Sequence, residues 1–325
     1  MAASLLLFSL VGLAGCGAIV DNRADRREAA AKAAYPPEGD FVEVAGRRLH
    51  YVMEGRGPDL VLLHGAGGST RDFTFSFVDR LKDRYRVIVF DRPGLGFSDR
   101  ASDRYGGATN PEAESPSEQA ILLQAAAAKL GAERPIVLGH SYGGAVALAW
   151  AVERPDNIAA LVTVSGASHP WPGNLSPYYS LTASPIGGAT VVPVLSAFAP
   201  KDFAERQLAR IFAPQEPPEG YAEHVGIGLA LRREVMRASA RQVNTLRPHV
   251  VELSKRYDDI DIPVEIVHGL DDPVVGFDIH ARRLAEDVPT AHMNALKGIG
   301  HMPHHAVPGK VAAAIDRAAS RAGLR

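Results

Sequence analysis

Residues 135–143 read Pro-Ile-Val-Leu-Gly-His-Ser-Tyr-Gly and place a G-x-S-x-G pattern between an apolar run and a helix-like segment of small residues. The run 136–138 predicts a buried strand, and residues 144–151 predict a helix that packs on a sheet. Ser141 therefore lies on a sharp turn from strand to helix, where glycines tolerate the crowding. The pattern alone also fits an ordinary glycine-rich turn. In the strand-turn-helix context, however, the serine hydroxyl is exposed beside free N–H groups of the helix, so Ser141 is the candidate nucleophile.

The composition excludes some classes of partner. The chain has 325 residues, 46% of them apolar, which is enough for a large core. Its net charge of −2 gives no indication of nucleic acid or of an anionic membrane surface as a partner. The single cysteine, Cys16, lies in the apolar N-terminal segment, so the folded part has no disulfide and tolerates an oxidising compartment.

From about residue 40, strand-like and helix-like segments alternate. Residues 41–44 and 48–52 flank Gly46 and predict a hairpin. Ser115-Pro116 is a start signal for a helix over 117–130. Further strands are predicted at 60–63, 87–90, 136–138, 158–164, 264–267 and 291–296, and further helices at 70–82 and 307–319. This order predicts an α/β fold with a mostly parallel sheet of about eight strands and helices on both faces.

The alternation breaks between residues 166 and 262. This stretch opens rich in Pro, Gly and Ser, and residues 202–212 and 228–244 then look amphipathic and helical. Because the strand pattern resumes afterwards, we expect a helical cap insertion rather than a second domain. Its aromatic residues either line an apolar pocket or form the core of the cap; they are Trp171, Tyr178, Tyr179 and Phe212. The expected organisation is a leader at 1–20, a tether at 21–39, a core at 40–165, the cap at 166–262 and the rest of the core at 263–325.

The N-terminal segment is the second informative feature. Residues 5–20 are nearly all apolar and contain Leu13-Ala14-Gly15-Cys16, which resembles a bacterial lipoprotein signal. The resemblance implies cleavage before Cys16, acylation of the new N-terminus and export to the periplasmic or cell-surface side of a membrane. The alternative is an uncleaved transmembrane anchor, since residues 2–20 are just long enough to span a bilayer. The charged, alanine-rich stretch 21–39 predicts a partly helical tether with no core face of its own.

A serine nucleophile needs a base and an acid that orients the base. Asp272 lies three residues after Gly269, in a loop that ends a predicted strand. Asp271 is the neighbouring candidate, and either aspartate could instead form the turn before Pro273. His301 follows the last predicted strand and is the candidate base.

His304 and His305 lie close to His301, and three histidines within five residues raise the question of a metal site. No cysteine, aspartate or glutamate lies beside them in the sequence, and a third ligand is not evident. The sequence therefore predicts no metal ion and no cofactor.

Two loops follow predicted strands near the start of the core. His64-Gly65-Ala66-Gly67 is expected to supply the backbone N–H of Ala66, which with that of Tyr142 would form an oxyanion hole. His64 itself is expected to hold this loop. The glycines of the loop at 91–99 lack the spacing of a dinucleotide fingerprint, so this loop is expected to be structural.

Taken together, these motifs resemble the α/β-hydrolase superfamily, in the cap-bearing branch of esterases, carbon–carbon bond hydrolases and epoxide hydrolases. The motifs are 64–67, 91–98, 139–143, 269–272 and 300–301, and the resemblance covers about residues 40–320. It implies a triad of Ser141, Asp272 and His301. Epoxide hydrolases and haloalkane dehalogenases carry an aspartate where this chain has Ser141, so the resemblance implies a serine hydrolase instead.

The predicted function is hydrolysis of a small acyl substrate, an ester, through an acyl-enzyme on Ser141. Acyl transfer to another nucleophile and cofactor-free perhydrolysis are alternatives on the same triad. A membrane-tethered binding protein without turnover is the alternative from another class. The sequence gives no indication of the oligomeric state.

Overall fold

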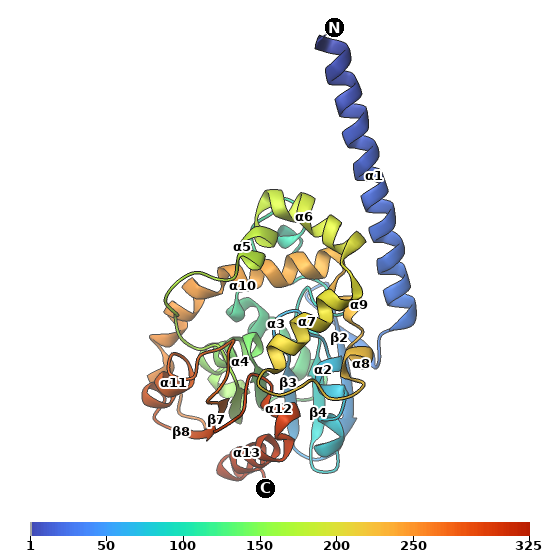
Figure 1. The fold of residues 1–325 in the computed structure, drawn as a ribbon. Coiled ribbons are helices and arrows are strands. Elements are labelled where there is room, and N and C mark those ends of the chain that lie inside the picture. The colour runs from blue at the N-terminus through green and yellow to red at the C-terminus, as the bar shows by residue number, and fades with distance from the viewer. Residues whose placement is uncertain (1) are drawn as a thin grey trace.

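The structure is a computed structural model that describes residues 2–325, with the side chains described from residue 17 onward apart from Lys201 and Ala204. Cys16, the predicted site of lipid attachment, lies outside the described side chains. Figure 1 shows an α/β domain from which one long N-terminal helix extends.

Eight strands form one sheet in the order β1-β2-β4-β3-β5-β6-β7-β8. β1 and β2 form an antiparallel hairpin, and β2 also pairs antiparallel with β4, while all other neighbours are parallel. The strands are β1 (Asp40–Val44), β2 (Arg47–Gly55), β3 (Asp59–Leu63), β4 (Arg86–Phe90), β5 (Ile136–His140), β6 (Ala160–Val164), β7 (Val264–Gly269) and β8 (Ala291–Leu296). The predicted fold class is confirmed.

Helices connect the strands of the core, and two more follow the last strand. They are α2 (Arg71–Thr74), α3 (Pro116–Lys129), α4 (Tyr142–Glu153), α11 (Ala281–Asp287), α12 (Pro303–Ala306) and α13 (Pro308–Arg321). α3 begins where the Ser-Pro signal predicts, because Ser115 and Glu118 form a reciprocal capping box. The single helix expected over 70–82 is instead α2 followed by a separate turn of 3₁₀ helix, Val78–Arg80. Thr70 makes no side-chain cap there, and the phenylalanines of this stretch are weak helix formers.

Both faces of the sheet are buried, as a parallel sheet requires. On β3, Val61 and Leu63 pack with α3 and α4, whereas Leu60 and Leu62 pack with α13 on the other face. Successive residues of the strand point to opposite faces, so one apolar run serves both cores.

Six helices lie between β6 and β7 and form the cap: α5 (Pro177–Ala183), α6 (Pro185–Phe198), α7 (Lys201–Phe212), α8 (Tyr221–Val225), α9 (Ile227–Ala230) and α10 (Arg233–Ser254). The last of them, α10, is shared with the core, because Leu246, Val250 and Leu253 belong to the main core cluster. Of the predicted cap aromatics, Phe212 is buried against Tyr221, whereas Tyr178 is partly exposed. The cap is therefore anchored to the sheet through α10.

The N-terminal helix α1 (Ala2–Ala34) runs through both the predicted leader and most of the predicted tether. Its first half extends away from the domain, and its second half lies against the cap (Figure 1). There Arg233 of α10 pairs with Asp21 at 3.0 Å, with Glu28 at 2.8 Å and with Asp25. Ala24 is fully buried in this contact. Residues 21–34 are thus a docked helix and not a free tether.

From residue 17 onward, where the side chains are described, no single helix combines the length and apolar character needed to cross a bilayer. Only α5 and α6 taken together reach that length and composition, and they are bent by 106° relative to each other.

Replacing Arg233 with alanine is expected to loosen the docked half of α1. The substitution leaves three carboxylates without their shared guanidinium, one of them on a largely buried glutamate. The free energy that holds α1 against the cap should therefore fall by about 1–2 kcal/mol, which is more than one exposed ion pair typically contributes. Limited proteolysis of residues 17–35 measures it. Arg206→Ala, which removes an exposed pair with Asp202, is the matched control. Equal cleavage rates in wild type and Arg233→Ala would contradict this account of the docking.

Candidate functional site

Ser141 lies at the junction of β5 and α4 with a backbone φ of +54° and ψ of −120°, a region that side-chain-bearing residues rarely adopt. The packing around it enforces this turn. A Cβ added to Gly139 would lie 2.1 Å from the carbonyl oxygen of Gly143, and one added to Gly143 would lie 2.2 Å from that of Leu63. Both glycines are therefore required for α4 to approach β3 and β5, and the half-buried Ser141 is held on the strained turn between them.

The loop that follows β3 lies directly beside this serine. A Cβ on Gly65 would be 3.1 Å from the Cβ of Ser141. Tyr142 is the first residue of α4, so its N–H has no acceptor inside the helix. Neither the N–H of Ala66 nor that of Tyr142 donates a hydrogen bond within the described part of the chain. Both donors are thus free to bind an anion next to Ser141.

His301 Nδ1 and Asp272 Oδ2 are 2.8 Å apart, and both side chains are buried. The other carboxylate oxygen of Asp272 accepts the N–H groups of Val274 and Val275 at 2.8 and 2.9 Å. Burial alone would raise the pKa of Asp272, but hydrogen bonds from His268 and His301 outweigh it and hold the pKa well below its usual range. Asp272 is thus ionised and fixes the orientation of the His301 ring.

Asp271, the alternative acid, does not make this contact. Its side chain is exposed, and its backbone N–H donates to the carbonyl oxygen of Ile299. The structure therefore brings His301 together with Asp272 and leaves Asp271 at the surface.

His301 also contacts the residue that precedes the serine. His140 Nε2 is 3.0 Å from the carbonyl oxygen of His301, and the two rings have centroids 4.9 Å apart. No hydrogen bond joins Ser141 Oγ to His301 among the described residues. Such contacts often tighten only when substrate binds.

Arg92 is a supporting residue that the sequence interpretation missed. Its guanidinium is fully buried and donates to the carbonyl oxygens of His64 at 2.8 Å and Gly65 at 3.0 Å. It also donates to the side-chain oxygens of Gln119 on α3, at 2.7 Å, and Gln242 on α10, at 3.0 Å. Burial lowers the pKa of Arg92 to about 10, so it stays charged at neutral pH. Its only sequence signal is the position of a cationic side chain two residues after a buried strand.

His64 holds the loop, as expected. Its Nε2 accepts the backbone N–H of Arg92 at 3.0 Å, so Nδ1 carries the proton and donates to the carbonyl oxygen of Gly65 at 2.9 Å. Burial, reinforced by the charge of Arg92, lowers the pKa of His64 to about 4. A neutral imidazole with both nitrogens in use suits a structural role.

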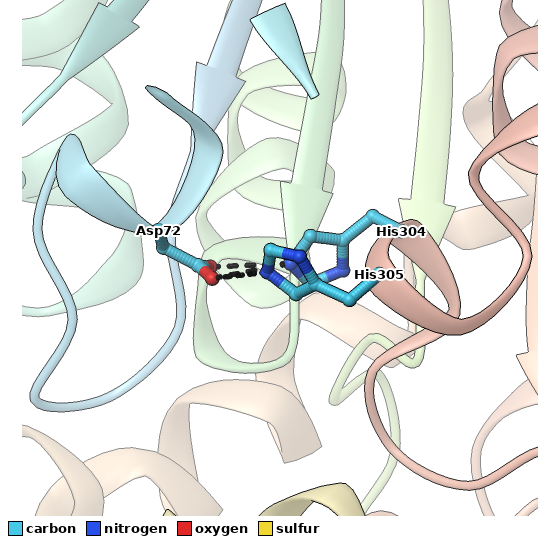
Figure 2. A group of neighbouring side chains, drawn as sticks. All are labelled: Asp72, His304 and His305. Atoms are coloured by element: carbon cyan, nitrogen blue, oxygen red, sulfur yellow. Dashed lines mark hydrogen bonds and ion pairs between the residues drawn. The ribbon is translucent and has the colours of Figure 1, made fainter. Parts of the chain in front are cut away.

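A second polar cluster lies next to this site and contacts it through His140. Figure 2 shows three of its members. Asp72 of α2 faces His304 and His305 of α12: His304 Nε2 is 3.3 Å from both carboxylate oxygens, and His305 Nε2 is 2.9 Å from Oδ1. The hydroxyl of Tyr221, from α8 of the cap, donates to the same Oδ1 at 2.8 Å. His140 Nδ1 lies 3.9 Å from Oδ2. The sequence interpretation did not connect Asp72 with the histidines.

The protonation states in this cluster are biased by burial. Burial alone would raise the pKa of Asp72, but His304 and His305 outweigh it and hold the pKa well below its usual range. Burial lowers the pKa of His304 to about 4 despite the nearby carboxylate. One buried negative charge thus sits among imidazoles. Asp72, His304 and His305 offer ligand atoms that all lie within 4.8 Å of one another, as a metal ion would need.

Comparison with known proteins agrees with this architecture. A family model described as the alpha/beta hydrolase fold matches residues 58–306. Haloalkane dehalogenase 2 of Mycobacterium tuberculosis is 26% identical over 294 residues, which cover 86% of this chain and 94% of that protein. The pimeloyl-[acyl-carrier protein] methyl ester esterase of Vibrio parahaemolyticus is 30% identical over 240 residues, covering 68% of this chain and 84% of that protein.

Among solved structures, the esterase RhEst1 from Rhodococcus sp. ECU1013 is similar, with a TM-score of 0.64 and 22% identity, covering 87% of this chain and 98% of that chain. The family match extends from β3 to α12 and includes Ser141, Asp272 and His301. The chain therefore belongs to the alpha/beta hydrolase fold family, as its motifs predicted.

Proposed function

We propose that this protein is a serine hydrolase that cleaves a carboxylic ester of a small acyl substrate. The observation that supports this most directly is the 2.8 Å contact between His301 Nδ1 and the buried carboxylate of Asp272. A histidine oriented in this way, near a serine on a strained turn, is the arrangement that activates a hydroxyl nucleophile.

In the proposed reaction, the Ser141 hydroxyl attacks the ester carbonyl while Nε2 of His301 takes its proton. Asp272 stabilises the resulting imidazolium through Nδ1–H. The N–H groups of Ala66 and Tyr142 donate to the oxyanion of the tetrahedral intermediate. His301 then returns the proton to the departing alkoxide. Water, deprotonated by the same histidine, attacks the acyl-enzyme and releases the acid and free Ser141.

The nature of the nucleophile favours ester hydrolysis over dehalogenation, although both activities occur in the names of similar proteins. Attack of a serine on an alkyl halide would expel a halide ion and leave an ether on Ser141, which water does not cleave, so the enzyme could not turn over. Attack on an acyl carbon instead gives an ester that water cleaves, and the oxyanion of each step forms next to the two free N–H groups. Acyl transfer uses the same first step, and an added alcohol acceptor would reveal it by diverting the acyl group from water.

Ser141→Ala is expected to lower kcat on p-nitrophenyl esters by roughly 10⁴–10⁶-fold, because the reaction loses its nucleophile and only anion binding remains. Esters of graded acyl length also define the preferred substrate. Ser320→Ala, at an exposed position of α13, is the control. A fluorophosphonate probe should label wild type quickly and Ser141→Ala not at all. Failure to label wild type would instead favour a binding protein without turnover.

Asp272→Asn is expected to cost on the order of 10⁴-fold in kcat, because an amide favours the wrong tautomer of His301. Asp271→Asn should cost less than about tenfold, since that side chain is exposed and makes no contact with the histidine. Steady-state kinetics on the same ester measures both. Reversed effects would move the acid to Asp271.

We also propose that the protein is attached to a membrane through its N-terminal segment, on the periplasmic or cell-surface side. Large apolar side chains are exposed on α1 and on the cap helices α5 and α6, which contact one another: Ile19, Tyr178, Leu181, Ile186, Val194 and Phe198. Ile186 alone is 77% exposed. In Figure 1, α1 extends past α6, the helix that carries Ile186, Val194 and Phe198. Such a surface is suited to contact with the boundary between lipid headgroups and acyl chains.

If Cys16 carries the lipid, the membrane-extracted protein begins at Cys16 and its intact mass includes acyl chains. Cys16→Ser should then accumulate as an uncut precursor. An unchanged mass in wild type and Cys16→Ser, with residues 1–15 retained, would support a transmembrane anchor instead. A full-length protein in the soluble fraction would contradict both.

A further inference from the structure

The Asp72 cluster contains an imidazole nitrogen whose lone pair faces a carboxylate. His140 Nε2 is 3.0 Å from the carbonyl oxygen of His301, and because a carbonyl only accepts, Nε2 must carry the proton. In the neutral ring Nδ1 then holds a lone pair. Nδ1 is buried, has no hydrogen-bond partner among the described residues, and lies 3.9 Å from Oδ2 of Asp72. Two acceptors therefore face each other in a dry environment.

The conflict lies away from water and next to other imidazoles. His140 is 3% exposed, and its ring centroid lies 4.5 Å from that of His304 and 4.9 Å from that of His301. A cation placed between the two would bind both lone pairs, which no proton donor in the described structure does.

His304 and His305 add two more nitrogen atoms that can bind the same cation. His304 Nε2 and His305 Nε2 lie 3.3 and 2.9 Å from oxygens of Asp72. Zinc bonds of about 2.0–2.1 Å in tetrahedral geometry place neighbouring ligand atoms about 3.3 Å apart. Both separations from Asp72 are close to this value. Facing a carboxylate that only accepts, the Nε2 atoms of His304 and His305 carry the protons when no metal is bound. An ion that takes their place would shift each proton to Nδ1, which has no partner among the described residues.

We propose that Asp72, His304 and His305 bind one divalent transition-metal ion of the zinc type and that His140 completes its coordination. The first three already have ligand atoms within 4.8 Å of one another, whereas His140 Nδ1 lies outside that group, 3.9 Å from Oδ2 of Asp72, and would move toward the ion. Three nitrogens and one carboxylate oxygen are ligands that zinc prefers, and four protein ligands leave no open position for water. The ion would thus be structural. It would join α2, the end of β5 and α12, three elements that lie far apart in the sequence, and it would leave His301 to Asp272.

The surroundings of the cluster fit such a site. Tyr221 donates to Oδ1 of Asp72, and His140 donates its other ring nitrogen to the carbonyl of His301. Partners of this kind typically orient metal ligands. The aromatic rings of Phe75, Phe212 and Tyr221 pack around His305 and separate the cluster from water. The sequence predicted no metal because it has no acidic residue beside the histidines, whereas the fold supplies Asp72 from a distant helix.

The test uses the full chain, free of any affinity tag, stripped with a chelator and titrated with Zn²⁺ and with Co²⁺. We expect one ion per chain, visible cobalt bands typical of tetrahedral coordination, and a higher temperature of unfolding with zinc. His305→Gln and Asp72→Asn should each weaken zinc binding by at least about 100-fold. His292→Gln, which alters a largely exposed histidine of β8, is the matched control and should bind zinc as wild type does.

Absence of stoichiometric zinc and cobalt binding by wild type would overturn the proposal and leave the cluster as a hydrogen-bonded network. Binding that is equally tight in His305→Gln and Asp72→Asn would overturn it as well, since the ion would then lie elsewhere. Should Asp72→Asn fail to fold, His305→Gln at the edge of the cluster and the wild-type cobalt spectrum still decide. None of these measurements depends on ester hydrolysis, so the metal site and the proposed function stand or fall separately.

Discussion

The close approach of α4 to β3 is the constraint on which the rest of this structure depends. The α-carbon of Gly143 lies so near the carbonyl of Leu63 that no side chain fits between them. This contact forces the chain to turn sharply after β5, and Ser141 takes the strained φ of +54° at the apex. A strained residue persists only when its surroundings over-determine it. Here the two cores on either side of the sheet supply that support, which is why the half-buried Ser141 can be held in one position.

A second fixed point is the buried guanidinium of Arg92, which joins parts that the sheet alone would not hold together. It binds the loop beside Ser141 through two carbonyl oxygens and connects that loop to α3 and α10 through two glutamines. Because α10 begins in the cap and ends in the core, the loop that carries the Ala66 N–H is tied to the cap. Movement of the cap would thus shift the loop of the proposed oxyanion hole, through the contact between Gln242 and Arg92.

The sequence predicted the features that depend on residues close together in the chain. The order of strands, the elbow, the capping box of α3 and the Gly-Asp loop each depend on neighbours within a few residues, and their physical causes are local. It did not predict Arg92 as a hub, Asp72 as the partner of His304 and His305, or the docking of α1 through Arg233, because these contacts join residues 150 or more positions apart in most cases. Only the folded sheet brings such residues together. Asp272 is intermediate: its spacing from Gly269 favoured it over Asp271, and the exposure of Asp271 agrees.

His140 connects the proposed reaction centre with the Asp72 cluster. It stands directly before Ser141 in the chain, donates Nε2–H to the backbone of His301, and turns its Nδ1 toward Asp72. The hydrogen bond to His301 therefore places the proton of His140 on Nε2. The lone pair on Nδ1 then points toward Asp72 and has no hydrogen-bond donor among the described residues. Any group that binds that lone pair also fixes the ring, and through it the carbonyl of His301. Stability in the cluster and alignment of the proposed base are thus coupled through one imidazole.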